Sequence, residues 1–255
     1  MTYLIAVFVF ALLTNGAFTR NVRIIGGEDV DTRTYPFVAL FKHRDYNFPI
    51  CGGAIISNNH VLTTIKCLYD EPDDFARVLV YTGMVPSESN PGNAHEIARV
   101  FNHPRFTAED TIEEMYLHDI SVVKLKRKMK FNEFQSAIQL LDRDVAENDN
   151  GFVLGWGSTT YPTLSYPTKM QKANMRIIPE RLYSTYFKFL IHDTQFCALD
   201  KAEVGACKGD GGDPFVIDGK LAGLTSVVYR CAKGVPDIYT KIYYYIDFIK
   251  DIMKI

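Results

Sequence analysis

Three short segments contain the side chains best suited to chemistry. His118-Asp119-Ile120 places a carboxylate just before an apolar run, and residues 62–67, Leu-Thr-Thr-Ile-Lys-Cys, place Lys66 beside a cysteine. Residues 207–214 read Cys-Lys-Gly-Asp-Gly-Gly-Asp-Pro, so Gly209 and Gly211 could present backbone N–H groups to a carbonyl oxygen. A lysine has an ordinary pKa of about 10.4 and stays protonated at neutral pH. Lys66 therefore supplies positive charge and is a poor proton acceptor.

The elements that position these segments are predicted to be antiparallel strands. Short alternating or β-branched runs, divided by polar turns, recur in both halves of the chain and indicate two β units. The runs are 37–41, 53–57, 60–65, 77–81, 120–125, 151–155, 172–178, 214–217, 221–228 and 237–241. Only the tail is expected to be helical, because its apolar residues recur at three- and four-residue steps: Ile242, Tyr245, Ile246, Ile249, Ile252 and Met253.

Composition excludes several classes of function. The chain has 255 residues, 47% of them hydrophobic, which suits a globular protein with a sizeable core. A net charge of -2 without long runs of one sign gives no electrostatic case for binding nucleic acid or an anionic membrane. We therefore expect protein or peptide partners, a monomer, and no cofactor. The acidic cluster Asp70, Glu71, Asp73 and Asp74 is interpreted as a solvated loop, with no metal site.

The N-terminus and the cysteines indicate a secreted, extracellular protein. Residues 1–17 combine an apolar stretch, Tyr3 to Leu13, with small and polar residues that suit signal peptidase. The apolar stretch is shorter than the roughly 20 residues of a membrane-spanning helix. Five cysteines in a secreted chain predict disulfides, with one thiol left over.

Six motifs, in order along the chain, resemble the landmarks of chymotrypsin- and trypsin-like serine proteases. They are Arg23-Ile24-Ile25-Gly26-Gly27, Cys51-Gly52-Gly53, residues 62–67, His118-Asp119-Ile120, Gly155-Trp156-Gly157 and residues 207–214. Residues 205–241 look especially like insect chymotrypsin-like proteins. The resemblance implies an all-β fold of two packed antiparallel β-barrels with a C-terminal α-helix, and functional loops in the cleft between the barrels.

The resemblance also implies that two of the three catalytic positions are degenerate. Asp119 stands at the position of the family's triad aspartate. Lys66 stands where the family's Thr-Ala-Ala-His-Cys motif has its histidine, and Gly211 where Gly-Asp-Ser-Gly-Gly-Pro has its serine. Peptide hydrolysis in this fold needs both missing groups, so we expect no peptidase activity. We also hypothesise an ion pair between Lys66 and Asp119, because a buried carboxylate without a partner would be costly.

Other family features are carried over residue by residue. The resemblance implies an activation cleavage between Arg23 and Ile24, whose new amino group would pair with Asp210, and backbone donors at Gly209 and Gly211. It implies a short propeptide at 18–23 and a protease-like domain at 24–255. It also implies disulfides Cys51–Cys67 and Cys207–Cys231. Cys197 is left as a buried thiol, with an intermolecular disulfide as the alternative.

The specificity pocket is expected to differ from that of trypsins. By resemblance its residues are Gly205 at the base, Ser226, Val228 and, in a nearby wall, Asp237. Val227 and Val228 stand where active relatives have an aromatic residue and a glycine, so they either narrow the pocket or only continue a strand.

Two functions remain open. The first is a non-catalytic binding protein that engages proteases, inhibitors or protease substrates in a proteolytic or defence cascade, or in venom. The alternative is a chymotrypsin-like endopeptidase with residual activity, for example with Ser226 as a relocated nucleophile.

Overall fold

The computed structural model describes residues 24–45, 49–71, 75–84, 92–107 and 116–255. The strands are β1 Glu28–Asp29, β2 Val38–His43, β3 Pro49–Ser57, β4 His60–Thr63, β5 Val78–Thr82, β6 Asn93–Asn102, β7 Ser121–Leu125, β8 Asn150–Gly155, β9 Gln171–Ile177, β10 Gln195–Leu199, β11 Pro214–Ile217, β12 Lys220–Val227 and β13 Asp237–Lys241. The helices are the 3-10 helices η1 Ile65–Cys67, η2 Glu180–Leu182 and η3 Ile242–Tyr245, and the α-helices α1 Tyr183–Tyr186 and α2 Ile246–Met253.

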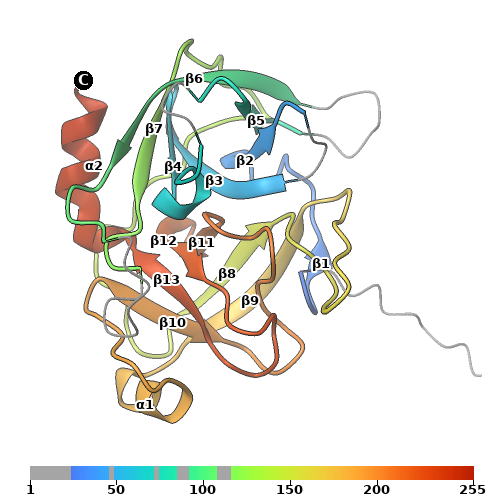
Figure 1. Ribbon diagram of the computed structural model, residues 1–255, viewed down its shortest axis with the longest axis vertical. Helices are drawn as coiled ribbons and strands as arrows, with labels where there is room; N and C mark the ends of the chain where they lie inside the picture. Colours follow the sequence, from blue (N-terminus) through green and yellow to red (C-terminus); the bar gives the residue numbers. More distant parts are fainter. Residues whose placement is uncertain (1–23, 46–48, 72–74, 85–91, 108–115) are drawn as a thin grey trace, which may run out of the picture.

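The strands form two antiparallel barrels, one above the other in Figure 1. The first barrel runs in the order β2-β3-β4-β7-β6-β5 and is closed by pairing of β2 with β5. The second runs β9-β10-β13-β12-β11-β8 and is closed by pairing of β8 with β9, while β1 adds to the outside of β9. Closure leaves few exposed strand edges. The predicted two-barrel fold is confirmed.

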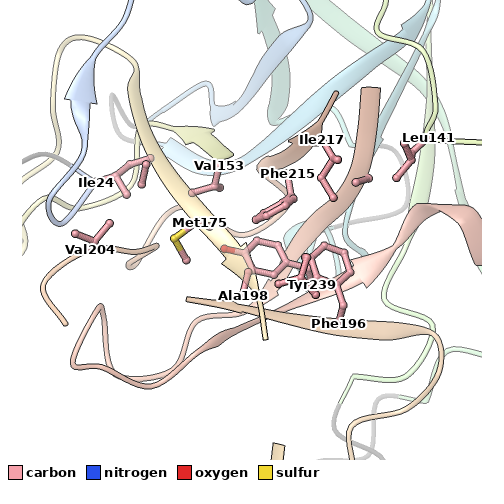
Figure 2. Close-up of a cluster of buried hydrophobic side chains, with 13 residues drawn as sticks. Ile24, Leu141, Val153, Met175, Phe196, Ala198, Val204, Phe215, Ile217 and Tyr239 are labelled. Atoms are coloured by element: carbon pink, nitrogen blue, oxygen red, sulfur yellow. The ribbon is translucent and has the colours of Figure 1, made fainter. Parts of the chain in front are cut away.

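Alternation along the strands fills each barrel with apolar side chains. In β9 every second residue is buried, from Gln171 to Ile177, because successive side chains of a strand point to opposite faces. Ala173, Met175 and Ile177 contribute to the core of the second barrel, together with Phe196, Phe215 and Tyr239 (Figure 2). The Phe196 and Tyr239 rings stack with their centroids 5.2 Å apart.

A shared core joins the two barrels and the C-terminal helix. Ala54, Leu62 and Val122 of the first barrel lie in one cluster with Val216 and Leu224 of the second. The tail packs onto this cluster through Ile242, Tyr245 and Ile249, all fully buried. The predicted apolar stripe is confirmed, although its first turn is the 3-10 helix η3. The shared core thus fixes the position of one barrel relative to the other.

Three strands were not predicted from the sequence: the two-residue strand β1, β6 and β10. β6 is mostly exposed, with only Ile97 fully buried, so its letters show no clean alternation. β10 is short and buried at nearly every position, which gives no alternation either. Residues 60–65 were expected to form one strand, but β4 ends at Thr63 and the chain turns into η1. No helix among the described residues is long and apolar enough to cross a membrane.

Candidate functional site

Asp119 is the fully buried acid of the site. It lies just before β7, and its Oδ1 accepts a hydrogen bond from the Lys66 backbone N–H at 3.1 Å. Its Oδ2 accepts a hydrogen bond from the Ser226 hydroxyl at 2.7 Å. Burial raises the pKa of Asp119 to about 6, although both hydrogen bonds and the positive charge of Lys66 favour the carboxylate. Both barrels therefore orient an acid that is mostly ionised at neutral pH.

Lys66 meets Asp119 through its backbone, and its side chain is directed elsewhere. The residue lies in η1 and is exposed. Its ammonium group lies 3.2 Å from the centroid of the Tyr116 ring, in cation–π geometry. The expected side-chain ion pair with Asp119 is thus replaced by the backbone hydrogen bond. Because both carboxylate oxygens already accept hydrogen bonds, the buried acid does not need an ammonium partner.

Gly211 lies beside the same segment. Its carbonyl oxygen accepts a hydrogen bond from the Gly52 N–H at 2.8 Å. A β-carbon placed on Gly211 would lie 3.4 Å from Cys51 Sγ and 3.8 Å from Cys67 Sγ, which is ordinary contact. The structure therefore brings Gly211 next to Cys67, the neighbour of Lys66, and leaves room for a β-carbon at this position.

The backbone around Gly209 faces an aromatic ring. Gly209 has a φ of +97°, a conformation that favours glycine. Within the ranges that the structure describes, the N–H groups of Gly209 and Gly211 donate to no acceptor. A β-carbon on Gly209 would lie 3.1 Å from Cε1 of Tyr166, so this ring lies against one of the two glycines.

A second buried acid lies beside Asp210. Asp210 accepts hydrogen bonds from the N–H groups of Gly157 at 2.7 Å and Cys207 at 2.8 Å. Asp213 is also fully buried, and its carboxyl oxygens fill the space above Gly52 and Gly155, where they accept no hydrogen bond from an N–H group of the described chain. Burial and the neighbouring Asp210 raise the pKa of Asp213 well above its ordinary value. Burial also raises the pKa of Asp210, and the hydrogen bond between the two carboxyls favours protonation of Asp213 and ionisation of Asp210.

Asp237 lies beside Gly205, at the base of the expected specificity pocket. Its Oδ2 accepts a hydrogen bond from Ala206 N–H at 3.0 Å, and its Oδ1 accepts one from Tyr229 N–H at 3.2 Å. A β-carbon on Gly205 would lie 3.1 Å from Asp237 Oδ2. Burial raises the pKa of Asp237 to about 8, although the two N–H groups favour the charged form. The carboxyl joins two segments, 205–206 and 229, and is mostly uncharged at neutral pH.

The two valines differ in their surroundings. Val227 ends β12 and packs in a buried cluster with Phe187, Cys197 and Ile238. Val228 lies beyond the strand and is half-buried. Val227 therefore packs in the core as an ordinary strand residue. For Val228, narrowing of the pocket stays a prediction.

The segment after the expected activation site packs against the second barrel. The Ile24 side chain is fully buried beside Val204 in the core cluster of Figure 2. Ile25 forms an isolated antiparallel bridge with Gly205, whose N–H donates to the Ile25 carbonyl oxygen at 2.9 Å. Arg23, with the expected signal peptide at 1–17 and propeptide at 18–23, lies outside the described residues, so cleavage stays a prediction.

Comparison with known proteins identifies the scaffold. The family described as Trypsin matches residues 24–249. The chain belongs to the trypsin family. It is 30% identical to trypsin theta of Drosophila erecta, over 88% of this chain and 84% of that protein. It is 27% identical to human kallikrein-8, over 96% of this chain and 94% of that protein. The solved structure of mouse neuropsin, a serine protease, superposes with a TM-score of 0.80 at 25% identity, covering 89% and 98% of the two chains.

The cysteines of this trypsin-family chain form the two pairs that the resemblance implies. Cys51 is bonded to Cys67, and Cys207 to Cys231. Disulfides are typical of an oxidising, extracellular environment. Cys197 lies outside both bonds, fully buried in β10, and its N–H donates to the Tyr183 hydroxyl at 3.2 Å. Burial raises the pKa of the Cys197 thiol, so this sulfur is unreactive in the folded chain.

Metal binding finds no support in the residues that are described. No group of three or more His, Cys, Asp and Glu side chains there could hold a metal ion. Asp73 and Asp74 of the acidic cluster lie outside the described ranges.

Some contributors to the site were missed from sequence. Tyr116 and Tyr166 lie in segments without a recognisable motif. There was therefore no reason in the sequence to expect one ring under Lys66 and the other against Gly209. Asp213 did carry a signal, since it departs from the family's Gly-Asp-Ser-Gly-Gly-Pro motif. Its burial beside Asp210 could be found only in the fold.

Proposed function

We propose that this trypsin-family chain is a secreted serine protease homologue without peptidase activity, which acts by binding other proteins. One observation carries the proposal: the oriented acid Asp119 holds the backbone N–H of Lys66 where an imidazole would be needed, and Gly211 stands beside Cys67 without a hydroxyl. The acid is present, and its two reactive partners are absent.

The chemistry supports inactivity strongly. Attack on a peptide bond requires a base that takes the nucleophile's proton and returns it to the leaving amine. The Lys66 ammonium is already protonated at neutral pH, and its contact with the Tyr116 ring favours that charge. In another serine protease, removal of the nucleophile or the base alone lowers turnover about a millionfold.

Ser226 is a poor candidate for a replacement nucleophile. The residue is only 7% exposed, and its hydroxyl donates a hydrogen bond to Asp119. The hydroxyl therefore orients the acid. This contact weighs against the alternative of a residual endopeptidase.

The remaining surface suits recognition of proteins. The trypsin-family scaffold is complete from Ile24 to the tail helix, and the N–H groups of Gly209 and Gly211 still point at no acceptor in the described chain. Asp237, mostly uncharged at neutral pH, gives no reason to prefer a basic side chain. We therefore propose proteases, their inhibitors or their substrates as partners of a monomer, in a defence cascade or in venom.

Biolayer interferometry on the purified secreted protein, cleaved after Arg23, tests the binding role. The probes are an active trypsin-family protease, a protein inhibitor of such proteases, and casein as an unfolded substrate. We expect at least one probe to bind with a Kd of about 1 μM or tighter, corresponding to about 8 kcal/mol. Failure of all three to bind, together with measurable cleavage of casein, would overturn the proposal in favour of an enzyme.

A further inference from the structure

Three of the six histidines gather at a pocket outside the degenerate triad. The pocket has a volume of about 360 Å³ and lies among the segment after β6, the residues preceding Asp119, the segment 190–194 before β10, and η3. Its polar lining includes Arg105, His118, His192, Asp193 and Tyr244. His103 lies behind His118, with the two rings stacked at 4.7 Å.

The tail helix fixes the imidazole rings. His118 Nδ1 and the Tyr245 hydroxyl are 2.8 Å apart, in hydrogen-bond contact. The His103 ring meets the rings of Tyr245 and Phe248 edge-on, at centroid distances of 5.1 and 4.9 Å. With Nδ1 occupied, Nε2 is the nitrogen through which His118 can meet a ligand. The His118 ring is therefore held in place in the pocket wall, with His103 stacked behind it.

The charges around the pocket favour an anion. Burial and, to a smaller extent, the positive charges of His103, Arg105 and His192 together lower the pKa of His118 to about 4. Burial and Arg105 also lower the pKa of His103. These groups thus repel one another when they are protonated, and Asp193 is the one carboxylate among the described residues of the lining. A bound anion would remove part of the repulsion and make protonation easier.

The rim of the pocket is apolar and exposed. Leu190 is 65% exposed and Tyr244 is 48% exposed, and both line the pocket with Leu117 and Ile191. Exposed large apolar side chains around a few convergent polar groups are typical of a binding site. A free inorganic anion would leave this rim unused. The lining fits a carboxylate that is carried next to an aromatic or branched aliphatic group.

We propose that this pocket binds an acidic residue of a partner polypeptide, flanked by an apolar residue, and that it binds more tightly as the pH falls from 7.5 to 5.5. The charged and titratable groups that face His118 are His103, Arg105, His192, Asp193 and the hydroxyls of Tyr244 and Tyr245, with Asp119 next in the chain. Protonation of the imidazoles in the complex gives the pH dependence, because each proton taken up strengthens attraction to the carboxylate. This site is independent of the proposed loss of catalysis.

Isothermal titration calorimetry on the full secreted protein tests the proposal at pH 5.5, 6.5 and 7.5 and low salt. The probe is an N-acetylated, C-amidated peptide with the sequence Gly-Leu-Glu-Phe-Gly, beside its Gln counterpart and sodium sulfate. We expect the Glu peptide to bind about tenfold more tightly at pH 5.5 than at 7.5, with uptake of protons. The Gln peptide should bind at least about tenfold more weakly than the Glu peptide at pH 5.5.

Two variants separate the pocket from an effect on folding. Arg105→Gln should weaken Glu-peptide binding about tenfold, and Asp193→Asn should strengthen it about threefold at every pH, a gain that a damaged fold cannot give. Equal binding of the Gln and Glu peptides, or an Asp193→Asn variant that binds no better, would overturn the proposal. Sulfate that binds as tightly as the Glu peptide would also overturn it, because a plain anion site would then suffice.

Discussion

Chromogenic peptides should be cleaved at least about 10³-fold faster by the Lys66→His, Gly211→Ser double variant than by the unmodified protein. The acid that must orient a new imidazole is already held by Ser226, and a β-carbon on Gly211 meets only ordinary contacts with the Cys51–Cys67 disulfide. Each single variant should stay inactive, because the nucleophile and the base act as a unit. Initial rates with substrates of aromatic, aliphatic and basic specificity give the comparison.

The matched control for that experiment is Lys66→Gln, Gly211→Ala, which changes the same positions without adding an imidazole or a hydroxyl. It should remain as inactive as the unmodified protein. If the double variant also stays inactive, addition of Asp213→Gly should restore turnover, because the extra buried acid lies against Asp210 and its loop. Unmodified protein that turns over as fast as the double variant would contradict the account.

The free energy of unfolding should fall by up to about 2 kcal/mol as the pH rises from 7.5 to 8.5. Asp213 and Asp237 have pKa values raised in the fold, the second to about 8, so each holds a proton that the unfolded chain has released. Each such group lowers stability by about 1.4 kcal/mol per pH unit up to its folded pKa. For a chain of this size the thermal midpoint should fall by about 5 °C, measured by circular dichroism.

Other groups confine this effect to neutral and alkaline pH. Between pH 4 and 6.5 the raised pKa of Asp119 lowers stability with rising pH, whereas the lowered pKa values of His60, His95, His103 and His118 raise it. Above about pH 7.5, one unit beyond the ordinary histidine pKa of about 6.5, the histidines are mostly neutral in both states, so the buried acids with raised pKa values dominate. Carboxylates with lowered pKa values, such as Glu96 and Asp142, are exposed and contribute little.

Two variants assign the effect to Asp213. Asp213→Asn keeps the size of the side chain and removes its titration, so about half of the pH dependence should disappear. Asp213→Gly should in addition raise the free energy of unfolding at pH 8 by about 2 kcal/mol, since it removes a buried carboxyl that accepts no hydrogen bond from an N–H group of the described chain. A pH profile that is the same for the unmodified protein and both variants would show that Asp213 is not a buried neutral acid.

The fold was predictable from sequence where the pattern of apolar residues reflects burial directly. Residues 214–217 and 237–241 coincide with β11 and β13, and the tail stripe coincides with η3 and α2, because burial on one or both faces leaves runs that sequence patterns detect. β6 was not predicted from sequence, because it is stabilised by hydrogen bonds to β5 and β7 and buries little side-chain surface. Main-chain hydrogen bonding of that kind leaves no pattern of apolar residues in the sequence.

The candidate site could be predicted from sequence only where its residues lie in a recognisable motif. Cys67 and Asp210 fix the register of Lys66 and Gly211, and the disulfide and hydrogen bonds place those residues together. The direction of the Lys66 side chain was predicted wrongly, since two hydrogen bonds from distant segments satisfy Asp119. The gathering of His103, His118 and His192 depends on contacts between loops and the tail helix, which no local spacing encodes.

The central claim is that the retained scaffold has no nucleophile, and covalent labelling tests it most directly. The unmodified protein, cleaved after Arg23, is incubated with a fluorophosphonate that reacts with activated serines, beside the double variant, and intact mass is measured by mass spectrometry. The account predicts an adduct on the double variant at position 211 and none on the unmodified chain. A stoichiometric adduct on the unmodified chain, at Ser226 or any other serine, would contradict it.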